Sequence, residues 1–236
     1  RRRKAIAQYP LKPATTVAAG RQLRPHNHRG VFYMTKKAAG NVLKGMSLLG
    51  LLMLANPVAA KADSLADNLA VCAGCHGENG VPIDTMTPVI AGQKRDYILN
   101  QLRDFKSGRR KSDVMSGIVE SLSWADMQAL AAHFSQQPVP DLKPAAPSAA
   151  TVAAAQAVID QLNCQGCHQQ NYEGDTVRPR LAGQQADYLD KTMKDFRDGA
   201  RTNYPGMSAL MRELSDDQIK AVSAYLAGHT TGVAQK

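Results

Sequence analysis

The sequence predicts an all-α protein built from two tandem copies of one small unit. The first observation is an internal repeat: "DTMTPVIAGQ" at 84–93 returns as "DTVRPRLAGQ" at 175–184. The second is helical periodicity, because apolar residues recur at i, i+4 and i+7 in both copies. The third is that no stretch alternates apolar and polar residues as a half-buried strand does. These observations favour two helical domains over one larger domain.

Each copy carries the same expected order of helices. A short first helix is expected at about 65–73. The middle helix of each copy has an apolar stripe, made of Ile98, Leu102 and Phe105 in the first copy and Leu189, Met193 and Phe196 in the second. The last helix begins with a capping-box pattern, which is Ser123-x-x-Asp126 or Ser215-x-x-Gln218. We therefore expect a first domain at 63–136, a proline-rich linker at 137–150 and a second domain at 151–236.

Positive charge is concentrated at the start of the chain. Residues 1–62 hold 12 Lys or Arg and no acidic residue, whereas the remainder holds 17 basic and 20 acidic residues, a balance of 17 − 20 = −3. The net charge of +9 therefore belongs to the leader and gives no reason to expect a nucleic-acid partner.

Residues 34–62 have the pattern of an export signal. Three lysines precede an apolar run at 46–58, and Ala60-Lys61-Ala62 is typical of a cleavage site. We expect cleavage before Asp63 and a periplasmic mature chain, with an uncleaved membrane anchor as the alternative. Residues 1–33 are expected to be an upstream or non-native extension, with Met34 as the true start.

All four cysteines lie in two C-x-x-C-H motifs, formed by Cys72, Cys75 and His76 and by Cys164, Cys167 and His168. A disulfide or a thioredoxin-like redox motif uses the same cysteine spacing, but the latter needs a βαβ context that the sequence lacks. A zinc site would need further ligands for each pair. The repeated motif in an exported helical chain favours covalent haem attachment, in which the thiols bond to the haem and the histidine binds its iron. Haem would also fill the core of a unit this small.

A second axial ligand of the iron should recur at the same place in both copies. Met115 follows His76 by 115 − 76 = 39 residues, and Met207 follows His168 by 207 − 168 = 39 residues. A thioether is a soft ligand for haem iron, although a methionine can also simply fill a core. Met211 is the alternative in the second copy.

Other repeated residues have two open interpretations. The carbonyl groups of Pro88 and Pro179 could accept a hydrogen bond from the iron-binding histidine, or the prolines could simply form turns. Tyr97 and Tyr188 either hydrogen-bond near the haem or pack, and packing is the favoured interpretation. The basic segment "GRRKSD" at 108–113 is either a solvated helix end or a docking surface.

These motifs resemble the cytochrome c4 family of class I dihaem cytochromes c, over about residues 63–228. The resemblance implies two cytochrome c domains packed against each other, each around one covalently bound haem. It implies that Cys72 and Cys75 hold the first haem with His76 and Met115 as axial ligands of its iron. It implies the same of Cys164 and Cys167 with His168 and Met207 for the second haem.

The resemblance also implies periplasmic one-electron transfer toward a terminal oxidase, and not catalysis. Expected partners are redox proteins such as a quinol-oxidising complex and a terminal oxidase, with possible peripheral membrane association and without a small-molecule substrate. An electron-accepting subunit of a dehydrogenase, for example a flavin-dependent sulfide dehydrogenase, is the first alternative. A dihaem redox enzyme is the second, and it would need an iron with an open or exchangeable face.

Overall fold

The computed structural model describes residues 58–229, and their side chains from Ser64 onward. The expected extension at 1–33 and the expected signal peptide as far as residue 57 lie outside this range. The described residues belong to one compact unit and contain helices without a strand. None of these helices combines the length and the apolar character needed to cross a bilayer.

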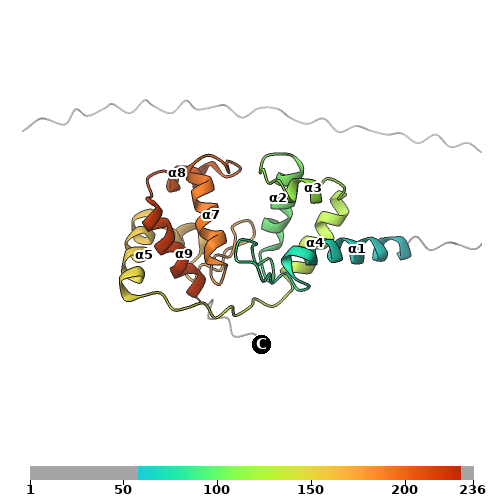
Figure 1. The fold of residues 1–236 in the computed structure, drawn as a ribbon. Helices are drawn as coiled ribbons and strands as arrows, with labels where there is room; N and C mark the ends of the chain where they lie inside the picture. The colour runs from blue at the N-terminus through green and yellow to red at the C-terminus, as the bar shows by residue number, and fades with distance from the viewer. Residues whose placement is uncertain (1–57, 230–236) are drawn as a thin grey trace, which may run out of the picture. The chain divides into compact units, whose positions relative to one another are not determined.

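The helices of the two copies follow each other in a similar order (Figure 1). The first copy consists of α1 (Val58–His76), α2 (Arg95–Lys106), α3 (Met115–Ile118) and α4 (Trp124–Ser135). The second copy consists of α5 (Ala149–Leu162), α6 (Gln165–His168), α7 (Ala186–Arg197), α8 (Pro205–Met211) and α9 (Asp216–Gly228). The all-α prediction is therefore confirmed.

The copies differ in the helix that leads into the C-x-x-C-H motif. In the first copy α1 is longer than the expected 65–73 and runs through His76 without a break. In the second copy the helix ends at Asn163, which has a left-handed φ of 50°, and α6 follows. Asparagine tolerates this conformation, whereas the corresponding residue of the first copy, Val71, is β-branched and strongly disfavours a left-handed φ.

Each copy has its own apolar core. The stripe expected for each middle helix is buried, which confirms the helical periodicity, and each last helix also buries an apolar stripe. The first core includes Ile98, Leu102, Phe105, Leu130 and Phe134, and the second includes Leu189, Met193, Phe196, Ile219, Val222 and Leu226. Residues of both cores line the site described below.

Both last helices begin with a complete capping box. The Ser215 hydroxyl accepts a hydrogen bond from the Gln218 backbone N–H, and the Gln218 side chain accepts one from the Ser215 backbone N–H. Ser123 and Asp126 form the same arrangement at α4. Each box satisfies two backbone donors that the helix itself leaves unpaired.

Removal of this cap should weaken the second copy. The Ser215→Ala variant is expected to lower the free energy of unfolding by about 1 kcal/mol, because an N–H at the start of α9 loses its acceptor. Urea unfolding of the haem-loaded protein measures this loss. Ser215→Asn keeps a side-chain acceptor and should remain close to the unaltered protein; an equal loss in both variants would contradict a capping role.

Candidate cofactor site

A large cavity of about 1500 Å³ lies between the helices of the described residues, and side chains from both copies line it. Its walls are largely apolar, with residues of both cores among them. The structure brings all eight predicted site residues to this cavity: Cys72, Cys75, His76, Met115, Cys164, Cys167, His168 and Met207. The cavity can therefore accommodate bulky apolar groups next to each C-x-x-C-H motif.

Both motif histidines are held in one orientation. The Nδ1 atom of His76 lies 3.0 Å from the carbonyl oxygen of Pro88, and the Nδ1 atom of His168 lies 3.1 Å from that of Pro179. A carbonyl oxygen can only accept, so each Nδ1 carries the hydrogen and each Nε2 keeps its lone pair. This geometry supports the orienting role of the prolines over the simple-turn interpretation.

Burial keeps these imidazoles neutral. His76 is 8 % exposed and His168 is 7 % exposed. Desolvation lowers the pKa of both histidines, and the hydrogen bonds to the proline carbonyls offset this only in part. A neutral imidazole with Nδ1 fixed and Nε2 free is the form that binds a metal ion.

Among the described residues, none of the four cysteines forms a disulfide. Cys72 and Cys164 are half-buried, whereas Cys75 and Cys167 are exposed. Desolvation raises the pKa of Cys72 and of Cys164. Within residues 58–229 no three histidine, cysteine or acidic side chains are grouped as a metal site. The position of both cysteine pairs on the lining of an apolar cavity fits attachment of an organic group, as the motif predicts.

The methionines of the second copy differ in their burial. Met193, Met207 and Met211 all line the cavity, but Met193 and Met211 are buried members of the core. Met207 is only partly buried, and so is Met115, its counterpart at the start of α3. The repeated position is therefore the feature that favours Met115 and Met207.

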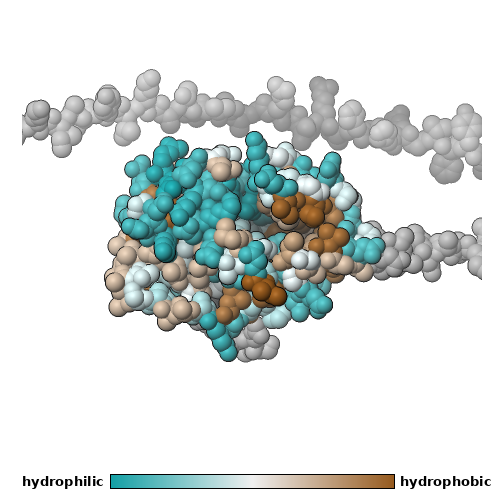
Figure 2. Space-filling view, in the orientation of Figure 1, coloured by the Kyte–Doolittle hydropathy of each residue, from teal (hydrophilic) through white to brown (hydrophobic). Residues whose placement is uncertain are grey.

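Met86 and Met127 correspond to the apolar residues Val177 and Ile219 in the second copy, and this correspondence predicts that both methionines pack. Met127 does so in the core of the first copy. Met86 is instead 46 % exposed at the edge of the cavity, so the expectation for it is wrong. Most of the exposed large apolar side chains belong to the first copy, and Figure 2 shows brown surface over that half.

The sequence did not anticipate a polar contact between the copies. The Arg110 guanidinium donates to the Tyr188 hydroxyl at 3.0 Å, and the Arg201 guanidinium donates to the Tyr97 hydroxyl at 3.3 Å. Each arginine also lies over a phenylalanine ring of its own copy. The two tyrosines therefore bind arginine as well as pack, and Arg110 of the "GRRKSD" segment turns inward and is not part of a solvated helix end.

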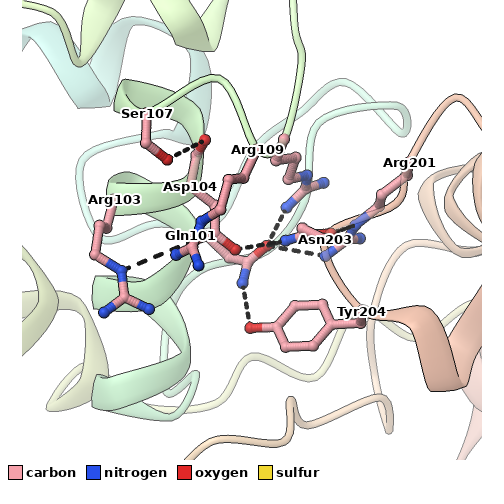
Figure 3. A network of polar contacts seen from close by, with 9 residues as sticks. Gln101, Arg103, Asp104, Ser107, Arg109, Arg201, Asn203 and Tyr204 are labelled. Carbon is pink, nitrogen blue, oxygen red and sulfur yellow. Dashed lines mark hydrogen bonds and ion pairs between the residues drawn. The ribbon is translucent and has the colours of Figure 1, made fainter.

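Gln101 is the centre of this contact. Its side-chain oxygen accepts from Arg110 at 2.8 Å and from Arg201 at 2.9 Å, and its amide nitrogen donates to the Tyr204 hydroxyl at 3.0 Å. Figure 3 shows Gln101 of the first copy facing Arg201 and Tyr204 of the second. Asp104 pairs with Arg109 and accepts from Asn203 in the same network.

The hydrogen bonds of the two inward arginines go to uncharged groups. Among the described residues, neither Arg110 nor Arg201 forms an ion pair with a carboxylate, although Asp195 interacts with Arg110 at longer range. Arg201 is only 5 % exposed, and both arginines line the cavity. Burial acts to raise the pKa of Tyr188, but the positive charges of Arg110 and Arg201 outweigh it and lower that pKa. A buried cation is costly without a counter-charge, and haem carries two carboxylates that would supply it.

Comparison with known proteins agrees with this geometry. The family model described as cytochrome c matches residues 152–230. A cytochrome c4 of Azotobacter vinelandii is 35 % identical over 212 residues, which cover 81 % of this chain and 98 % of that protein. The crystal structure of reduced recombinant cytochrome c4 from Pseudomonas stutzeri matches with a TM-score of 0.64 and 32 % identity, over 72 % of this chain and 98 % of that one.

The name of a further relative states the enzyme from which that relative accepts electrons. The thiosulfate dehydrogenase electron acceptor of Stutzerimonas stutzeri is 35 % identical over 167 residues, which cover 66 % of this chain and 77 % of that protein.

The cavity, the paired attachment motifs and these likenesses define a c-type cytochrome with covalently bound haem, an electron-transfer protein that exchanges electrons with other redox proteins. The chain belongs to the cytochrome c4 family.

The buried arginines provide a test of how the cavity holds an anionic group. Arg201→Met is expected to lower the free energy of unfolding of the haem-loaded protein by about 3 kcal/mol. The substitution removes the four hydrogen bonds of the Arg201 side chain, and it would leave a buried haem carboxylate without its positive partner. Urea unfolding measures this free energy. Arg197→Met breaks ion pairs with the exposed Asp198 and Asp216 and one hydrogen bond to the Leu214 carbonyl, and it should cost much less. Similar losses would show that Arg201 acts as an ordinary surface charge.

Proposed function

We propose that the chain is a dihaem one-electron carrier of the periplasm that accepts electrons from a quinol-oxidising complex and delivers them toward a terminal oxidase. In this proposal Cys72 and Cys75 hold one haem and Cys164 and Cys167 hold the other. The observation that carries the proposal is that both motif histidines face the cavity with Nδ1 fixed and Nε2 free.

The axial ligands proposed for the two irons are His76 with Met115 and His168 with Met207. When bound, haem supplies a reversible one-electron change between ferric and ferrous iron. The protein's own residues would hold the iron in a fixed set of ligands, so that little rearrangement accompanies the electron. The apolar lining would limit the access of water, and Arg110 and Arg201, which line the same cavity, would supply positive charge to the haem carboxylates.

The identity of the redox partner is the part of the proposal with the fewest supporting observations. The relative named as a thiosulfate dehydrogenase electron acceptor supports a second candidate, in which this chain accepts electrons directly from a dehydrogenase. The chemistry at the two irons is the same in both candidates. Stopped-flow reduction by a purified thiosulfate dehydrogenase, compared with reduction by a quinol-oxidising complex, distinguishes them.

The optical spectrum with and without carbon monoxide tests the closed faces. We expect two low-spin haems per chain and a ferrous spectrum that carbon monoxide does not change. Rapid binding of carbon monoxide at either haem would mean that a methionine is not a firm ligand, and an enzyme would then be the better interpretation.

A further inference from the structure

Each copy places a buried glutamine on the backbone of the other copy. The Gln184 side chain accepts from the Val89 backbone N–H at 2.8 Å and donates to the Val89 carbonyl at 2.9 Å. The Gln93 side chain accepts from the Arg180 backbone N–H at 2.7 Å and donates to the Arg180 carbonyl at 3.0 Å. The two contacts are symmetric, since both glutamines end the repeated "AGQ" segment and both target residues follow the repeated proline.

These contacts act on the peptide groups that orient the histidines. The N–H of Val89 and the C=O of Pro88 belong to one peptide group, and that C=O accepts from His76 Nδ1. A chain of hydrogen bonds thus runs from His76 through this peptide group to Gln184 of the other copy. The same chain runs from His168 through the peptide group of Pro179 and Arg180 to Gln93.

The glutamines are rigidly held in this position. Gln93 is 4 % exposed and Gln184 is 3 % exposed. Each side-chain oxygen also accepts from the next backbone N–H, that of Lys94 or Gln185, at 2.9 Å. The glycine before each glutamine has a positive φ, 61° at Gly92 and 65° at Gly183, a conformation that glycine adopts without strain. The "AGQ" segment is therefore a turn that aims an amide at the other copy.

We propose that Gln184 and Gln93 are positioning residues that act across the copies, each setting the orientation and hydrogen-bond strength of the histidine in the opposite copy. This inference rests on the proposed binding of iron by His76 and His168. It predicts crossed control, in which the second copy tunes the first haem and the first copy tunes the second haem.

The direction of the effect follows from polarisation. An acceptor on the peptide N–H makes the carbonyl oxygen of that group a stronger acceptor, because hydrogen bonds in a chain reinforce one another. A stronger acceptor at Nδ1 raises the basicity of the histidine as a ligand, which favours the ferric state. Loss of the glutamine should therefore raise the reduction potential of the haem in the opposite copy.

The experiment is potentiometric titration of three variants of the dihaem protein. Gln184→Met is expected to raise the equilibrium constant for reduction of the haem on His76 about threefold, or about 30 mV at 59 mV per tenfold change for one electron. Gln93→Met should do the same to the haem on His168. Thr85→Val removes a different hydrogen bond between the copies, from Thr85 to Asp187 at 2.6 Å, and should move neither potential. The two haems are assigned beforehand from Met115→Ala and Met207→Ala.

A conservative variant separates positioning from folding. Gln184→Glu keeps an acceptor oxygen, and its protonated carboxyl group has the same donor and acceptor as the amide. It should therefore return the potential toward that of the unaltered protein at the acidic end of the titrated pH range, and it remains informative if Gln184→Met fails to assemble.

The outcomes are distinct from those of the proposed function. Equal shifts of both haems, a shift only in the copy that carries the substitution, or no shift would overturn crossed control. None of these results would affect the ligation of iron by His76 and His168. If His76→Ala leaves the spectrum of the first haem unchanged, the proposed ligation itself fails, whatever the glutamine variants do.

Discussion

Without haem, the chain is expected to lose cooperative unfolding. The buried apolar residues of each copy flank a cavity of about 1500 Å³. Without haem, the apolar side chains that face this opening lack packing partners on one side. A unit as small as each copy normally needs a cofactor or another cross-link to complete its core. The haem-free chain should therefore collapse into a loosely packed state.

This prediction is tested by producing the chain without haem maturation. Thermal melts followed by far-ultraviolet circular dichroism should show a sharp transition for the haem-loaded protein and a broad, weak one for the chain without haem. Binding of an apolar dye would report the exposed core. A double variant, Cys72→Ala with Cys75→Ala, serves as the intermediate case, since it should lose the first haem alone. A sharp melt of the haem-free chain would show that the helices pack without the cofactor.

The parts of the fold that depend on local pattern could be predicted from the sequence. The apolar stripes of α2 and α7 are buried as their spacing requires, and both capping boxes form. The attachment motifs needed only the spacing of cysteine and histidine. The length of α1 was underestimated, because the apolar periodicity of 65–73 does not show that the helix extends to 58–76.

The contacts between the copies could not be predicted in the same way. Gln93 with Gln184 and Arg110 with Arg201 stand at matching positions of the repeat, 184 − 93 = 91 and 201 − 110 = 91 residues apart. That recurrence was a usable signal, because polar residues repeated near an attachment motif seldom serve only solubility. Their partners lie in the other copy, however. The apolar periodicity of the helices in one copy does not show how the two copies pack together.

The symmetry of the interface gives it a functional meaning. Each copy supplies the other with a glutamine on a histidine-orienting peptide group and with a tyrosine that binds an arginine beside the cavity. Within the described residues, neither copy alone contains both partners of these glutamine and tyrosine contacts. Under the proposed crossed control, each haem would be tuned by the glutamine of the opposite copy, and electron transfer between the two haems would depend on this interface.

Removal of one methionine is expected to open one iron and leave the other closed. Met115→Ala should let the ferrous haem of the first copy bind carbon monoxide, and Met207→Ala should do so for the second. The potential of the opened haem should fall substantially, because a thioether ligand favours ferrous iron. Carbon monoxide difference spectra measure the number of open haems, which should be one per chain in each variant and two in the double variant.

Met211→Leu is the matched control, because Met211 lines the same cavity but is buried in the core and corresponds to Val119 in the first copy. It should bind no carbon monoxide and keep both potentials. If Met211→Leu opens the second iron and Met207→Ala does not, the ligand of that iron lies one helical turn further along the chain. The repeat would then be broken at the iron itself, and the two haems would have to be treated as chemically different sites.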